Sequence, residues 1–366
     1  MSNSYIDKYQ QIESSAAEYM EDINQLTADL RSMAAYMNQY DLDEVRNAIG
    51  DFNTTAFENI NASQVCDLMA DEQTRQALQS YINLVTEASK DVENGYELKI
   101  NIDPNNFMIN LAEKRQDLYN SIAIEDDPNM LMFIESYRYA EMISEEAASE
   151  KSSKIEIANM IFKAYESQGI QKNILASNAV NNIDTMLLGL EYAIRHGAIV
   201  DSYTFGKNIE NLMLTAASTA HTEDLDAIEV VANISMKAYE RLEQAKAVHE
   251  ELLSHRIELE ERLRTSQNVD EKSHLEEQLR QTNEEFARSE RVVAVMTENV
   301  TQAFKIAAEI SEKLEGSKGM EKLDSMIMGH NNEEAREMFN AVVAERHSSH
   351  EHGVEHSASN DDALEF

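Results

Sequence analysis

The chain has 366 residues, of which only 2 are proline and 10 are glycine. Turns depend on these two residue types, whereas alanine, glutamate, glutamine, leucine and methionine favour helix, so the composition predicts an all-α protein. The formal net charge of −37 argues against direct binding of nucleic acid or anionic membranes, because both need lysine and arginine.

Amphipathic helices are predicted over residues 1–94. Apolar residues recur there at steps of three and four, which is the spacing of one helix face. The first such series comprises Ile12, Ala16, Met20, Ile23, Leu26, Leu30, Met33 and Met37. Further helices are expected from Asp41 to Gly50 and from Ser63 to Val92. The next segment, 95–104, alternates briefly without an evident partner strand, so an extended linker is predicted.

A central helical bundle is predicted over residues 105–223. Two aspartate–proline pairs, Asp103-Pro104 and Asp127-Pro128, have the pattern of helix starts, with aspartate as the cap and proline in the first helical position. The individual helices are expected at 105–121, 128–149, 154–167, 171–195 and 205–220.

The segment 224–315 is predicted to form an antiparallel coiled-coil hairpin with its turn near 265–270. Steps of three and four run along both halves and are interrupted by the polar sequence TSQNVD. The two series mirror each other about residue 269, so that folding the chain back brings apolar residues level with one another. The main pairs of this seam are Leu242 with Met296, Leu252 with Phe286, Leu259 with Leu279, and Leu263 with Leu275.

Polar residues select the register of this hairpin. The same folding brings His249 level with Ser289, and Arg256 level with Thr282. A shift by one heptad would bury His249 and Arg256 against apolar layers, which costs their desolvation. At 1.5 Å per residue the hairpin would be about 50 Å long. Supporting ion pairs four residues apart are expected for Glu258–Arg262, Glu260–Arg264, Glu276–Arg280 and Glu284–Arg288.

Short helices are predicted over 316–346, and the acidic, histidine-rich tail at 347–366 is predicted to be disordered. The tail has no lysine or arginine and no apolar periodicity. Residues 352–356, His-Gly-Val-Glu-His, have the spacing of an inverted zinc-protease motif. Gly353 lies inside this motif, which needs a stable helix, and its presence argues against catalysis. Loose binding of zinc or nickel is an alternative to a solvated tail, with His347, His350, His352 and His356 as the candidate ligands.

The last residues of the tail have an acidic run that ends in phenylalanine. They resemble the tips through which bacterial single-strand-binding proteins recruit partners, with Asp361, Asp362 and Phe366 in the matching positions. The resemblance implies docking of this tip in a basic pocket of a partner. It does not extend to the rest of the chain, which lacks an aromatic-rich strand fold and a basic groove.

These features predict a non-enzymatic structural or scaffolding protein that acts through helix-mediated self-assembly or protein–protein interaction, with a homo-oligomer expected. No motif indicates a catalytic residue or a cofactor. Two alternatives remain: an acidic internal assembly scaffold or virion-associated protein of a phage, which would be similar in composition, and an adaptor that recruits a partner through its tail. The single cysteine, the absence of a secretory signal and the lack of a long apolar run predict a cytoplasmic protein without a membrane span.

Overall fold

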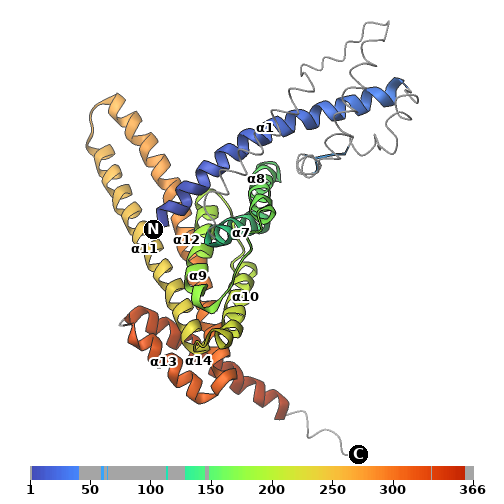
Figure 1. The fold of residues 1–366 in the computed structure, drawn as a ribbon. Helices are drawn as coiled ribbons and strands as arrows, with labels where there is room; N and C mark the ends of the chain where they lie inside the picture. The colour runs from blue at the N-terminus through green and yellow to red at the C-terminus, as the bar shows by residue number, and fades with distance from the viewer. Residues whose placement is uncertain are drawn as a thin grey trace, which may run out of the picture. The chain divides into compact units, whose positions relative to one another are not determined.

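The computed structural model describes residues 2–40, 59–61, 64, 113, 128–144, 148–330 and 332–358. Within these residues the secondary structure is helical throughout and contains no strand, which confirms the predicted fold class (Figure 1). The predicted elements at 41–50, 63–92, 95–104 and 105–121 lie outside the described residues, apart from single positions. By its pattern of contacts the chain divides into two compact units.

Unit 1 consists of Met1–Asp127 and Ser149–Gln171. Its first helix, α1 (Ser2–Tyr40), buries one face as its periodicity predicts. The buried residues of the predicted series are Ile12, Ala16, Met20, Ile23, Leu26 and Leu30. Arg31 Nε donates to the carbonyl oxygen of Ile60 at 3.0 Å, which ties this short piece of chain to α1. Nearly all of α8 (Ala148–Ser167) belongs to the same unit.

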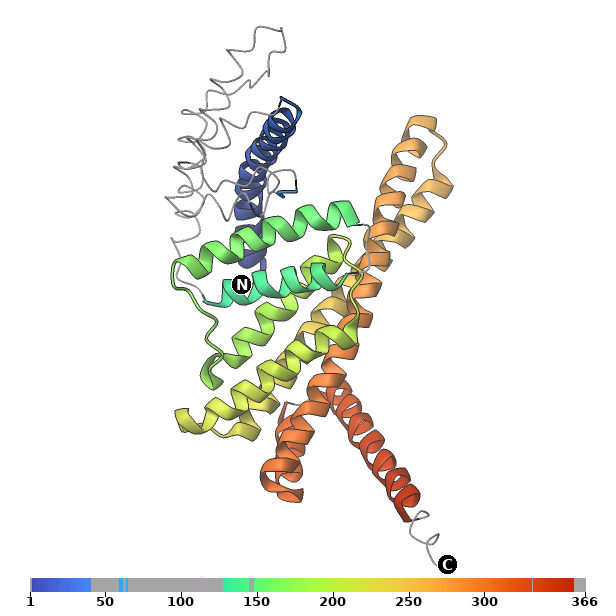
Figure 2. The same cartoon turned by 90° about the vertical axis from the view of Figure 1, so that its right-hand side faces the viewer.

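Unit 2 consists of Pro128–Ala148 and Lys172–Phe366 and contains the hairpin. Its described helices are α7 (Pro128–Ile143), η1 (Ala176–Asn178), α9 (Ala179–Arg195), α10 (Ser202–Ala220), η2 (His221–Glu223), α11 (Ala227–Thr265), α12 (Val269–Glu315), α13 (Ser317–Gly329) and α14 (Glu333–Ala358). The lower parts of α11 and α12 pack against α9 and α10, and α7 packs on α9. The short helix α13 lies against the same end of the hairpin, and α14 packs on α12 (Figure 2).

The long antiparallel hairpin lies where the sequence predicts it. Its helices are joined by a turn over residues 266–268. The Asn268 side chain accepts a hydrogen bond from the backbone N–H of Asp270 at 3.0 Å, so it caps α12. Gly316 ends α12 with φ +61°, a conformation that glycine adopts without the steric penalty of a side chain.

The helix predicted over 171–195 begins later than expected. Residues 171–175 are not helical, and α9 starts at Ala179 behind the short turn η1. The Glu223 carboxylate accepts hydrogen bonds from the backbone N–H groups of Ala176 at 2.8 Å and Ser177 at 3.1 Å. A capping group so distant along the chain is invisible to a local periodicity, which explains the misplaced boundary.

The last helix continues beyond the predicted boundary at residue 346. The backbone of α14 is helical to Ala358, through the first part of the segment predicted to be disordered. Propagating an existing helix is easier than nucleating one, which accounts for continuation beyond the apolar positions that dock α14. Residues 359–366 lie outside the described residues.

Asp226 caps α11 and links it to α13. Its carboxylate accepts hydrogen bonds from the backbone N–H groups of Ile228 at 2.9 Å and Glu229 at 3.4 Å, and it forms an ion pair with Lys322. Burial alone would raise the pKa of Asp226. The Lys322 ammonium and the two N–H groups outweigh burial and hold this pKa below its ordinary value of 3.8.

Replacing Asp226 by alanine is expected to lower the free energy of unfolding by about 1 kcal/mol at neutral pH, the usual contribution of an N-cap. Because the folded-state pKa is depressed, the charge contributes fully above the unfolded-state pKa and is lost as the pH falls through the folded-state pKa. The difference in urea midpoint between wild type and Asp226→Ala should therefore shrink on acidification to about pH 3. Asp226→Asn is the control, since it keeps an acceptor oxygen without a titrating charge. A difference that grows on acidification would contradict this role.

Candidate interaction site on the hairpin arm

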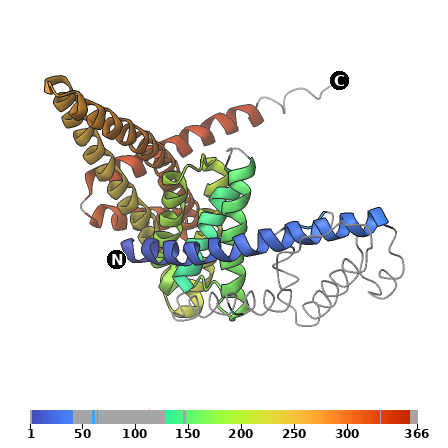
Figure 3. The same ribbon diagram turned by 90° about the horizontal axis from the view of Figure 1, so that it is seen from above.

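The free end of the hairpin extends away from the other helices of unit 2 (Figures 2 and 3). We call residues 250–287 the arm. At its base Arg288, on α12, donates from Nη1 to the carbonyl oxygen of Arg195 at 3.2 Å, which fastens the hairpin to the end of α9. Beyond this point each helix of the arm has the other as its packing partner within unit 2.

The predicted seam residues lie between the two helices. Leu242 and Met296 are fully buried near the base, and Leu259 and Leu275 are buried within the arm. The remaining seam residues are half-buried, because two helices alone cannot enclose a seam on all sides. They are Leu252, Leu263, Leu279 and Phe286.

Two polar contacts confirm the predicted register. His249 Nδ1 lies 2.9 Å from Ser289 Oγ. Ser235 Oγ, which donates to the carbonyl oxygen of Val231 at 2.9 Å, lies 3.3 Å from the carbonyl oxygen of Ala303. In the mirror arrangement about residue 269, His249 is level with Ser289 and Ser235 is level with Ala303. The Ser289 hydroxyl donates its proton to the carbonyl oxygen of Phe286 at 2.7 Å, so it accepts from His249, and this geometry assigns the proton to Nδ1.

The Arg256 side chain does not form a buried layer opposite Thr282. Its guanidinium lies over the Phe286 ring at 5.2 Å from the centroid, and its Nε donates to Glu260 at 3.1 Å. The His249 ring stacks on Phe286 at 4.5 Å between centroids. Arg256 therefore covers an aromatic ring with its charged end still partnered and partly solvated.

The four predicted ion pairs on the arm are not formed. Arg280 pairs with Glu277 at 2.6 Å and with Glu284 at 2.5 Å, and its guanidinium holds the pKa of Glu277 down to about 2. Because acidic residues outnumber basic ones, each cation has several carboxylates three and four residues away with which it can pair. In the described arm, Arg262 and Arg264 make no ion pair.

Two apolar side chains of α11 are uncovered in the arm. Leu253 is 39% exposed and Ile257 is 56% exposed, and their four-residue spacing puts them on the same side of the helix. Glu250 lies one turn before Leu253, and Arg264 lies two turns after Ile257. We call these four residues the α11 strip. Their steps of three, four and seven are those of a second helix-packing face beside the buried seam.

The structure does not test the predicted residues of the tail. The backbone of His347, His350, His352 and His356 belongs to α14, but their side chains lie outside the described residues, as do Asp361, Asp362 and Phe366. Among the described residues no group of three or more histidine, cysteine, aspartate or glutamate side chains is arranged to hold a metal ion. The described helices likewise include none long and apolar enough to cross a membrane.

Comparison with known proteins gives no family assignment: no family model, curated protein or solved structure matches this chain.

Proposed function

We propose that the chain is a non-enzymatic structural protein of a reducing, cytoplasmic compartment that self-associates through its arm. Two copies pack their α11 strips against each other in antiparallel orientation, which joins two hairpins into a four-helix bundle. The observation that carries this proposal is the exposure of Leu253 and Ile257 on a helix that already buries a separate seam. Covering these two side chains removes apolar surface from water, which is the main favourable term in association.

Charge selects the register of the two strips. In a symmetric antiparallel pair, two residues face each other when their residue numbers add up to a fixed value, which is twice the number of the residue at the symmetry axis. Pairing centred on Ile257 places Ile257 against its own copy and Glu250 opposite Arg264 of the second copy. Leu253 is then level with Glu261 of the second copy, whose methylene groups cover it while the carboxylate stays in water. A pair with Leu253 opposite Ile257 would instead bring Glu250 close to Glu260, which places like charges together. The arrangement centred on Ile257 is therefore favoured.

The net charge makes this association dependent on salt. Two chains that each carry −37 repel each other over distances comparable with the Debye length, about 10 Å at 0.1 M salt. The two Glu250–Arg264 contacts lose less on screening than the whole-chain repulsion does. The dimer is thus expected to become more populated as the ionic strength rises.

Ile257→Glu is expected to convert the dimer into a monomer, because it places two carboxylates at the symmetry axis in place of two apolar side chains. Size-exclusion chromatography with light scattering on the full chain, at low and high salt, measures this mass. Val269→Glu is the matched control, since Val269 is 77% exposed at the tip of the arm and off the strip. A glutamate in the first turn of α12 also suits the helix dipole.

Charge exchange tests the register of the two strips. Glu250→Arg and Arg264→Glu should each weaken the dimer, and the double variant should restore it. A wild-type chain that is monomeric at every salt concentration would overturn the proposal. So would a larger oligomer indifferent to Ile257→Glu, which would favour an assembly scaffold built on other surfaces.

A further inference from the structure

A second feature of unit 2 lies away from the arm, between α7 and α10. The two helices approach each other at one end, where the Tyr139 and Phe205 rings are 6.1 Å apart and the Tyr139 hydroxyl faces the carbonyl oxygen of Thr204 at 3.5 Å. Farther along they leave a cavity of about 170 Å³, which the extended residues Lys172 and Ile174 border. Its size is close to that of an engineered cavity of about 150 Å³ that holds benzene.

The floor of this cavity is apolar. Met132, Met186 and Leu212 contribute buried side chains to its lining. Thioether sulfur makes favourable contacts with aromatic rings, and methionine adapts its shape to a bound group. The floor therefore fits the face of a flat ring.

Two charged groups of the lining compensate each other. Glu135 and Lys172 form an ion pair, and Arg138 is engaged in an interaction as well. Partial burial lowers the pKa of Lys172, as expected for an ammonium removed from water. An anionic or cationic ligand would add an uncompensated charge to this site, which costs desolvation. A neutral ligand avoids this cost.

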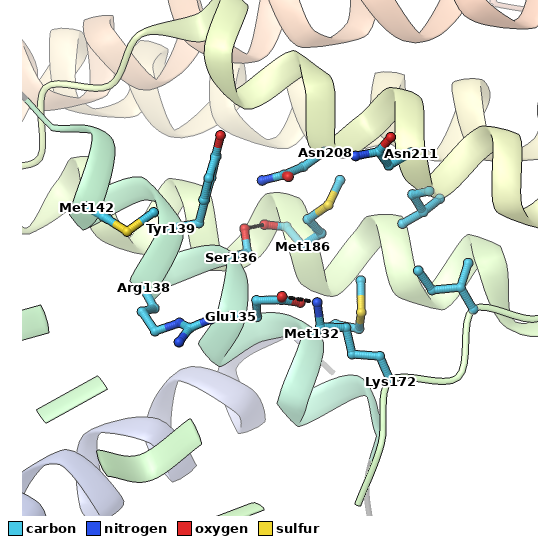
Figure 4. A pocket seen from close by; sticks show the side chains of 12 residues that line it. Met132, Glu135, Ser136, Arg138, Tyr139, Met142, Lys172, Met186, Asn208 and Asn211 are labelled. Carbon is cyan, nitrogen blue, oxygen red and sulfur yellow. Dashed lines mark hydrogen bonds and ion pairs between the residues drawn. The ribbon is translucent and has the colours of Figure 1, made fainter. Parts of the chain in front are cut away.

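Two carboxamides are the polar groups that remain for a ligand. The Ser136 hydroxyl donates its proton to the carbonyl oxygen of Met186 at 2.5 Å, so this proton is not available to a ligand. The side chains of Asn208, which is half-buried, and Asn211, which is exposed, are both on α10 and make no hydrogen bond within the part of the chain that the structure describes, so both can exchange water for a ligand. Figure 4 shows them across the cavity from the Glu135–Lys172 pair, with methionine side chains between.

We infer that this cavity binds a small, neutral, planar molecule with an amide or lactam edge, such as a free pyrimidine base. Each asparagine carboxamide has donors and an acceptor side by side, and the edge that complements it is another amide. The ring face of the ligand lies on the methionine floor. This site goes beyond the proposed self-association and does not depend on it.

Titration of the full chain with uracil, followed by NMR of ¹³C-methyl methionine, tests the inference. Met132→Leu and Met186→Leu assign the two floor signals with little change in volume. Saturable shifts of both signals are expected, with a dissociation constant of about 1 mM or tighter for a ligand of this size. Benzoate is the comparison ligand, because it has a similar ring with a charge and no donor, and it should leave both signals unchanged.

Asn208→Ala and Asn211→Ala should each weaken uracil binding at least about fivefold, the effect of losing one ordinary hydrogen bond. Asn283→Ala, on the exposed face of α12 in the arm, is the matched control and should bind uracil as the wild type does. Unmoved methionine signals would overturn the site, and benzoate binding as tightly as uracil would overturn the neutral ligand class. Unchanged uracil affinity in both cavity variants, with their helicity intact, would overturn the role of the carboxamides.

Discussion

Replacing Gly189 by alanine is expected to destabilise the chain by about 2–3 kcal/mol, the range for overpacking a closely packed interior. Gly189 lies in α9 where α7 crosses it. A Cβ atom at this position would lie 2.5 Å from the backbone carbonyl oxygen of Phe133 and 3.1 Å from Ser136 Cβ. Neither neighbour is the end of a flexible side chain, so α7 would have to move away from α9.

Replacing Gly206 by alanine should instead stabilise the chain. Gly206 is also helical and buried, but a Cβ atom there would meet only Gln302 Cγ at 3.5 Å and Asn299 Oδ1 at 4.0 Å, which are ordinary contacts. Alanine then gains about 0.5–1 kcal/mol through helix propensity and the smaller entropy of the unfolded chain. Urea unfolding followed by circular dichroism measures both variants. Equal shifts of the midpoint in the same direction would contradict the close contact of α7 with α9.

Asp184→Ala is expected to cost about 2 kcal/mol, far more than removal of its main partner. Arg241 Nε donates to Asp184 at 2.7 Å, and Lys237 lies 3.7 Å from the same oxygen. The Arg241 side chain is only 5% exposed, whereas the Asp184 side chain is 26% exposed. Loss of one partner from a fully buried pair costs about 3–5 kcal/mol, and solvent around Asp184 reduces that figure.

The asymmetry follows from the count of charges around this contact. Asp184→Ala leaves two cations close together, one of them buried. Arg241→Met leaves Asp184 with Lys237 and replaces the buried part of arginine by an apolar side chain of similar length, so about 1 kcal/mol or less is expected. The double variant should recover much of the stability lost in Asp184→Ala. A double-mutant cycle on urea midpoints measures this coupling, and equal costs for the two single variants would exclude the arrangement.

Sequence periodicity was sufficient for the helices and for the pairing of the hairpin. The buried face of α1 follows steps of three and four, which a helix must place on one side. The register of α11 and α12 followed from matching two such series, because polar positions such as His249 and Ser289 tolerate few alternative partners. These are properties of one helix or of two helices joined by a short turn, and both are recorded in the order of residues.

Other features depend on neighbours that are distant in the chain. The helix predicted to start at residue 171 starts later, because Glu223 accepts a hydrogen bond from the backbone N–H of Ala176. The partners of Arg280 depend on side-chain geometry among several carboxylates. Gly189 has no periodic signal, since its role comes from the path of α7.

What is determined by the sequence alone is therefore the all-α class, the positions of most described helices and the register of the hairpin. Only the tertiary structure distinguishes Ile234, buried on α11 outside the predicted seam, from Leu253 and Ile257, uncovered on the same helix. The cavity between α7 and α10 and the α11 strip are of this second kind. Their physical reason is that burial is a property of the packed neighbours around a residue, and those neighbours lie many residues away in the chain.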